Sequence, residues 1–372
     1  MTTRPSGNDL ALQLIAQDSM FLRRFLQAAV GSGDQAIVPI FCLYNYMCLV
    51  IHESHRALGR IAPNIADALA YEHAPAIERA RHSVKLYDDK GKQPAEVSAE
   101  FRRIVEQHRS ELLNNTRLPL GRPWKKDLAL WYFRGRLIST SHTVSFFLAL
   151  PPQSLKPEVL GPDLYDIAVE QGRYVNAVAD GFPWEGTCFL DTVTEADWTV
   201  LDVRAKKHYQ AGFDPSLPEA VKASLTAMTC ALNILSVLLA DEPENVSTVS
   251  LWKMRYITLH HVLSSLTKLD EQYGAGLRPP DRSLLREILD APLTGLISQA
   301  HGGFRNTLVH YLPPRNVHEQ LSFDQPLYGL LDAYFPKAAD ARLLNEGLAG
   351  FTSHTAGLLD AWSRSCMPLS QM

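Results

Sequence analysis

The sequence predicts an all-α protein built from helical bundles. Apolar residues recur at steps of three and four along most of the 372 residues, and the strict alternation that indicates a strand is scarce. Hydrophobic residues make up 46% and charged residues 20% of the chain, as in an ordinary globular protein. A chain of this length can bury enough apolar surface to fold without a disulfide or a structural metal.

The first predicted domain is an N-terminal helical region. Asn64 and Ser98 each precede an amphipathic stretch and suit the N-cap position, because their side chains can accept hydrogen bonds from the free amides of a helix's first turn. Sensing or RNA positioning is the role that we expect for this domain. Its boundaries are residues 1–150, with helices expected over 10–25, 41–59, 65–74, 98–115 and 125–150.

A connector is predicted over residues 151–216. It opens with the proline-rich stretch 151–162, and proline removes a backbone donor and disfavours helical geometry in the residue before it. Within the rest of the connector, residues 175–193 are expected to be irregular and residues 195–210 to form one short helix, and the connector is expected to pack between the two halves.

The second predicted domain is an up-and-down bundle over residues 217–372. One of its helices is expected to run without a break from Pro292 into Tyr311, or to kink at Gly302 and Gly303. The expected helices cover residues 219–240, 249–274, 282–289, 292–311 and 341–365.

Composition and missing motifs exclude several classes of protein. The net charge of −4 argues against a surface that binds nucleic acid or anionic membrane everywhere. Five cysteines without a C-x-x-C pair indicate reduced thiols, and the polar N-terminus and the lack of a long apolar run predict a cytoplasmic protein without a membrane span. The P-loop, G-x-G-x-x-G and G-x-S-x-G motifs are missing, which argues against nucleotide hydrolases, Rossmann oxidoreductases and α/β-hydrolases.

The segment HGGFRNTLVHYLPP, residues 301–314, holds the candidate catalytic residues Arg305, Asn306 and His310. On a helix, Asn306 and His310 lie one turn apart on the same face, and Arg305 lies at the edge of that face. Arginine offers a forked, permanently charged donor for phosphate, and histidine exchanges protons near neutral pH. We therefore expect the three side chains to point at one spot.

This R-N-x-x-x-H motif, late in a helical bundle, resembles the signature of HEPN domains. The resemblance covers about residues 217–365 and implies a metal-independent endoribonuclease that works as a homodimer and needs no cofactor. It implies that Arg305 holds the scissile phosphate, that His310 is a general acid or base, and that Asn306 positions them. The RNA product would end in a 2′,3′-cyclic phosphate.

The same resemblance implies a toxin or defence effector, with an antitoxin or a regulatory protein as a partner. HEPN toxins paired with nucleotidyltransferase antitoxins often have a tyrosine two positions after the histidine, where this chain has Leu312, so that mode of regulation is not carried over. The alternative function is a non-catalytic HEPN-like module that binds RNA or a protein partner. A partly exposed His310 in a basic cleft favours catalysis, and a buried His310 favours a structural role.

Residues 79–136 form the candidate RNA-binding region. They contain fourteen lysines and arginines against seven acidic residues. Such a local excess of positive charge can follow a phosphate backbone, although a solvated helix face has the same composition. Arg103 and His108 repeat the Arg-to-His spacing of the motif without its asparagine, so by resemblance the N-terminal domain could also be a degenerate HEPN-like domain. With Lys125 and Lys126 they are the candidate substrate-binding residues.

A metal site is the third hypothesis. Cys48, His52 and His55 follow one another at steps of four and three, with Glu53 beside them, which is the spacing of three ligands on one helix face. No obvious fourth ligand follows, so partly buried polar residues are the simpler interpretation, and we predict no metal.

Overall fold

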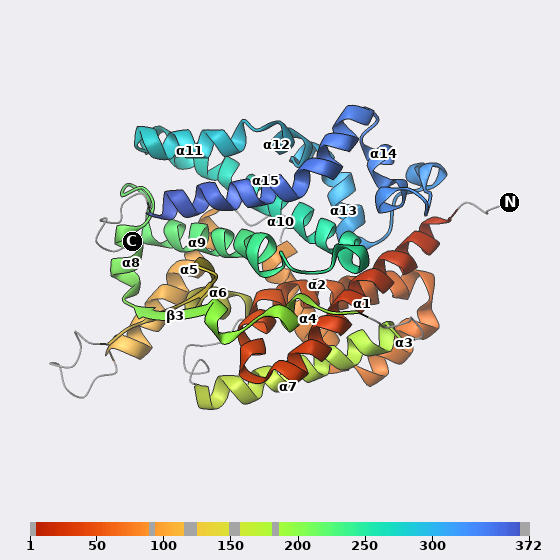
Figure 1. The fold of residues 1–372 in the computed structure, drawn as a ribbon, viewed down its shortest axis with the longest axis horizontal. Coiled ribbons are helices and arrows are strands. Elements are labelled where there is room, and N and C mark those ends of the chain that lie inside the picture. Colours follow the sequence, from red (N-terminus) through yellow and green to blue (C-terminus); the bar gives the residue numbers. More distant parts are fainter. Residues whose placement is uncertain (1–4, 89–93, 115–124, 149–156, 181–185, 365–372) are drawn as a thin grey trace.

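The protein is helical throughout, with one small sheet (Figure 1). The computed structural model describes residues 5–88, 94–114, 125–148, 157–180 and 186–364. The predicted fold class is confirmed, because every expected helix outside residues 125–150, 195–210 and 292–311 is present wherever it falls on described residues. Residues 115, 149–156, 365 and Cys366 lie outside the described part.

The helices of the first half follow each other closely in the sequence. Pro63 and Pro157 are the first residues of their helices. Proline is tolerated there because the first backbone amides of a helix have no partner within the helix, so its missing N–H costs no hydrogen bond. The bounds are α1 Gly7–Ser32, α2 Ile37–Ile61, α3 Pro63–Glu72, α4 Ala74–Asp88, α5 Pro94–His108, α6 Ser141–Leu148 and α7 Pro157–Val178.

The second half is dominated by two long helices, α10 and α15, which pack against each other. Helices α11 and α12 also pack on α15, and the three lie together along one side of the molecule in Figure 1. The bounds are α8 Ala205–Ala211, α9 Glu219–Asn233, α10 Glu244–Tyr273, α11 Pro279–Leu289, α12 Pro292–Leu296, α13 Gly302–His310, α14 Leu330–Tyr334 and α15 Ala338–Arg364.

A three-stranded antiparallel sheet replaces two expected helical stretches. Strand β1 (Leu128–Phe133) lies between β2 (Arg136–Thr140) and β3 (Trp198–Val203). The helices expected over residues 125–150 and 195–210 were therefore wrong, apart from α6 and α8 at their ends. Arg134 and Gly135 both adopt positive φ, at 47° and 76°, and this tight turn folds β1 back onto β2. The aromatic residues of β1 favour a strand because their side chains pack well on a pleated surface.

One hydrophobic cluster contains side chains from both predicted domains. It extends from Leu10 of α1 to Trp362 of α15, and both side chains are fully buried. Helix α7, which begins inside the predicted connector, packs along α1 and α2. The division of the chain at residues 150 and 216 stays a prediction.

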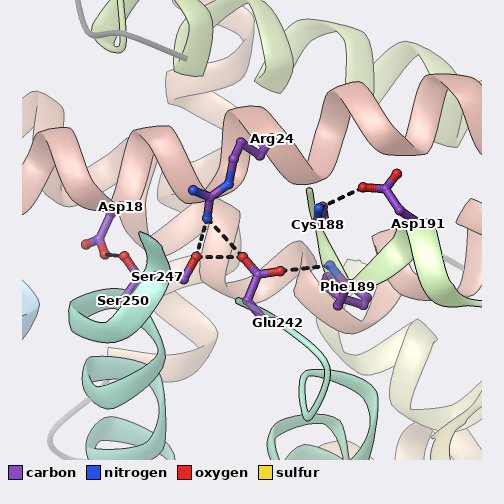
Figure 2. A network of polar contacts seen from close by, with 8 residues as sticks. All are labelled: Asp18, Arg24, Cys188, Phe189, Asp191, Glu242, Ser247 and Ser250. Carbon is purple, nitrogen blue, oxygen red and sulfur yellow. Dashed lines mark hydrogen bonds and ion pairs between the residues drawn. The ribbon is translucent and has the colours of Figure 1, made fainter. Parts of the chain in front are cut away.

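Buried polar contacts join the first helix to the tenth. Arg24 of α1 donates to the carboxylate of Glu242 at 2.9 Å and also to the hydroxyl of Ser247, and Glu242 accepts from the amide of Phe189 at 2.9 Å (Figure 2). The Arg24 and Glu242 side chains are 3% and 0% exposed, so water does not screen their interaction. Six residues earlier on α1, nearly two turns away, Asp18 pairs with the buried Lys253 of α10.

Two helices are long and apolar enough to cross a membrane by length and composition alone. They are α2 and the stretch Glu219–Leu238, which joins α9 to the π-helical turn Ile234–Leu238. In their most apolar windows, 61% and 72% of the residues are buried inside the fold, as in the core helices of a folded protein. The expected lack of a membrane span stays a prediction.

Candidate functional site

Helix α13 carries the motif and is shorter than expected. The predicted continuous helix is broken, because α12 ends at Leu296 and a 3-10 turn, Gln299–His301, separates it from α13. Gly302 and Gly303 open the new helix, and glycine's low helix propensity explains why the chain breaks just before them. Tyr311 ends α13 in the left-handed conformation, at φ 66°.

Packing on both sides fixes the direction of α13. Its Phe304 is fully buried and makes edge-on ring contacts with Trp252 and Tyr256 of α10. At the other end, the Tyr311 hydroxyl donates a 2.8 Å hydrogen bond to Asp18 of α1. These anchors hold the polar face of α13 against α2.

His310 forms a hydrogen-bonded pair with Glu53 of α2. Its Nδ1 lies 2.8 Å from Oε2 of Glu53. The carboxylate can only accept, so Nδ1 carries the proton and Nε2 is the nitrogen left for proton exchange. The Glu53 side chain is 1% exposed and that of His310 is 28% exposed, so the pair consists of a buried orienting carboxylate and an imidazole that solvent can reach.

Glu53 is held in its charged form. Burial by itself raises the pKa of this carboxyl, but the hydrogen bond and charge of His310, with the charges of Arg56 and His52, outweigh burial and bring the pKa below its usual value. Arg56 donates to Glu53 at 3.1 Å. The negative Glu53 in turn fixes the orientation of the His310 ring.

An open hollow lies between α2 and α13 beside this pair. It measures about 950 Å³ with its mouth and is lined by Arg56 and Arg60 from α2 and by Asn306 and His310 from α13. Arg56 and Arg60 are one turn apart on α2, and both are exposed. Two cations, an amide and an imidazole around one concave space are suitable for a phosphate group.

Arg305 does not line this hollow. It is 7% exposed and lies on the far side of α13, where its guanidinium is 3.3 Å from Nε2 of His261. Burial, together with the charge of Arg305, lowers the pKa of His261 to about 3, so this imidazole is neutral and can accept the hydrogen bond. Arg305 also donates a long hydrogen bond to Asn306 Oδ1, at 3.4 Å. The structure thus brings Asn306 and His310 together and joins Arg305 to them only through Asn306.

The candidate substrate-binding residues lie elsewhere. Arg103 is exposed on α5 and pairs with Glu100 of the same helix. His108 is fully buried and shares a 2.9 Å hydrogen bond with Ser145, and burial lowers its pKa to about 4. Lys125 and the exposed Lys126 precede β1. Helices α5 and α13 are well apart in Figure 1, and residues 89–93 and 115–124 of the basic region lie outside the described part.

Cys48, His52 and His55 do not form a metal site. No group of three or more possible ligands comes together within the described ranges. Cys48 is fully buried and accepts from the Gln171 amide at 3.3 Å, whereas His52 and His55 are partly exposed. The four cysteines that the structure describes, Cys42, Cys48, Cys188 and Cys230, are free thiols.

The sequence analysis missed Arg56 and Arg60 as site residues and considered Glu53 only as a neighbour of metal ligands. A signal was present, since Glu53, Arg56 and Arg60 follow one another at steps of three and four and therefore share one face of a helix. Nothing in the sequence, however, indicated that this face would meet a motif more than 250 residues further on.

No family model matches this chain, and neither a curated protein nor a solved structure matches it. The resemblance to HEPN domains therefore rests on the motif alone. The chemistry of the hollow is an independent basis for a functional hypothesis.

Proposed function

We propose that the protein is a metal-independent endoribonuclease of the HEPN type, with its active site in the hollow between α2 and α13. The observation that carries the proposal is the partly exposed His310, which is oriented by the buried Glu53 beside two arginines. A histidine used only for packing would lie in an apolar or fully paired environment without a concave basic surface in front of it.

The chemistry needs no metal because RNA contains its own nucleophile. Nε2 of His310 takes the proton of a 2′-hydroxyl, and the 2′-oxygen forms a bond to the adjacent phosphorus. The bond from phosphorus to the 5′-oxygen breaks, and this oxygen receives a proton. The products are a 2′,3′-cyclic phosphate and a 5′-hydroxyl.

The other residues of the hollow have separate tasks in this proposal. Arg56 and Arg60 bind the non-bridging phosphate oxygens and stabilise the charge that develops on them. Glu53 keeps the imidazole in the reactive tautomer. Arg305 is a positioning residue, since it holds the side-chain oxygen of Asn306 and so directs the amide of Asn306 toward the hollow.

A homodimer is part of the proposal. In-line cleavage benefits from a base on one side of the phosphate and an acid on the other, and each hollow contains a single His310. A second copy that faces the first across a two-fold axis would supply the missing group.

The test is cleavage of total RNA and tRNA in EDTA by the wild type and by His310→Ala, Arg60→Ala and Arg305→Ala. Arg342→Ala, an exposed arginine of α15, is the matched control. We expect cyclic-phosphate ends from the wild type and the control, a loss of at least a hundredfold in His310→Ala, and smaller losses in the other two variants. Equal cleavage by His310→Ala and the wild type would refute the site. RNA binding without cleavage, even at excess protein, would favour the non-catalytic module.

A further inference from the structure

A second cavity lies beyond the basic hollow, in the middle of the fold. Helix α2 and strand β2 form one side of it, and α6, α9 and α10 form the rest. Its empty space is about 890 Å³ including the open mouth, and about 90 Å³ of this admits the centre of a water-sized sphere, several times the room that one water molecule needs.

The lining of this cavity is apolar and uncharged. Large apolar side chains dominate it, among them Phe41, Leu49, Phe147 and Ile257. No acidic, basic or histidine side chain is among the described residues that line it. Burial raises the pKa of the two thiols, Cys42 and Cys230, so both stay neutral. An ion would lose its hydration here without gaining a partner.

A few polar groups could still orient a ligand. The Asn45 amide and the Thr258 hydroxyl face the cavity without a hydrogen-bond partner among the described residues. Asn45 offers a donor and an acceptor, and Thr258 offers a hydroxyl. One or two such groups in an apolar lining are typical of a site that fixes the orientation of a small molecule.

The backbone beside the cavity is irregular. Ile234 and Leu235 line it from the π-helical turn Ile234–Leu238, in which the Leu239 amide donates to the Ile234 carbonyl at 2.9 Å. This π-helical turn forms the C-terminal end of the α9 helix, so the helix widens where it borders the cavity. The two helical stretches that are long and apolar enough to span a membrane, α2 and Glu219–Leu238, both contribute to this lining, so part of their hydropathy belongs to the cavity.

We propose that this cavity binds a small, uncharged and mostly apolar molecule that carries one hydrogen-bonding group. The proposal is independent of the proposed nuclease activity, because none of the residues in the hollow lines the cavity.

The test uses two probes with the same aromatic framework, N-phenylnaphthylamine, which is neutral, and anilinonaphthalene sulfonate, which is an anion. In fluorescence titrations of the full chain we expect saturable binding of one neutral probe per chain. We expect the sulfonate to bind at least tenfold more weakly, because no cation faces the cavity. Equal binding of the two probes, or no saturable binding of the neutral one, would overturn the proposal.

Two cavity-filling variants localise the site. Ala231→Phe and Leu49→Trp should each weaken binding of the neutral probe at least tenfold, while Ala231→Ser, at the same position, should keep the wild-type affinity. Circular dichroism and melting curves identify any variant that has not folded. If neither filling variant folds, the comparison of the two probes on the wild-type chain tests the proposal without them. Unchanged affinity in both folded filling variants would contradict the assignment.

Discussion

Glu53, a buried residue at the wall of the hollow, is the residue on which the proposed chemistry depends. Replacing it by glutamine keeps its shape and removes the carboxylate that accepts from Nδ1 of His310 and orients its ring. We predict that Glu53→Gln lowers the kcat for RNA cleavage by about a hundredfold to ten-thousandfold and leaves RNA affinity within a fewfold of the wild type.

The measurement is single-turnover cleavage beside RNA binding, with Arg60→Ala as the contrasting variant. Because Arg60 is proposed to hold phosphate, its loss should weaken RNA binding and reduce the salt dependence of affinity, which Glu53→Gln should not do. A Glu53→Gln protein that cleaves at the wild-type rate would show that the pair with His310 is structural.

The carboxylate of Asp18 joins helices that are far apart in the sequence. It accepts from the hydroxyls of Tyr46 at 2.6 Å, Ser250 at 2.7 Å and Tyr311 at 2.8 Å, and it pairs with Lys253. These donors come from α2, α10 and the end of α13. The Lys253 side chain is fully buried, and burial lowers its pKa although Asp18 opposes this effect.

Removing Asp18 alone should destabilise the whole molecule. We predict that Asp18→Ala reduces the free energy of unfolding by about 3 to 5 kcal/mol, because it leaves an uncompensated buried cation. The double variant Asp18→Leu with Lys253→Met should recover part of this loss, since no buried charge then lacks a partner. Urea unfolding of the three proteins measures this difference, and a double variant that is less stable than Asp18→Ala would contradict the explanation.

Some of these helices and strands could be predicted from the sequence and others could not. Long helices such as α1 and α10 were predictable because their apolar residues repeat over many turns. Strand β1 was not, because LALWYF is a short apolar run that fits a helix and a strand equally well, and its pairing with β3 spans some seventy residues. Asn306 and His310 could be found by local spacing, whereas the partner Glu53 depends on tertiary packing.

Buried histidines should make the whole molecule sensitive to acid. His108 and His142 are fully buried in edge-on contact, and His260 is 6% exposed with neither ring nitrogen hydrogen-bonded within the described chain. Burial lowers the pKa of His108 and His260 to about 4, the latter also through the charge of Arg305, and that of His142 falls well below its usual value.

Below pH 6.5 the unfolded chain takes up protons at these positions and the folded chain does not, so stability falls as the pH falls toward 4. At pH 5 each such histidine lowers the free energy of unfolding by about 2 kcal/mol relative to neutral pH. Three of them together lower it by an amount comparable to the total stability of an ordinary domain, which is about 5 to 15 kcal/mol. We predict that the free energy of unfolding falls by about 2 kcal/mol less in His260→Leu than in the wild type when the pH is lowered from 7.5 to 5.

Urea midpoints across this range, with His354→Leu as the control, test the prediction. The His354 side chain is 52% exposed, so its removal should leave the slope of stability against pH nearly unchanged. Parallel slopes for His260→Leu and the wild type would mean that His260 gains its proton as readily in the folded chain as in the unfolded one. In that case the acid sensitivity would come from the other buried histidines, and His142→Phe should then reduce the slope of stability against pH.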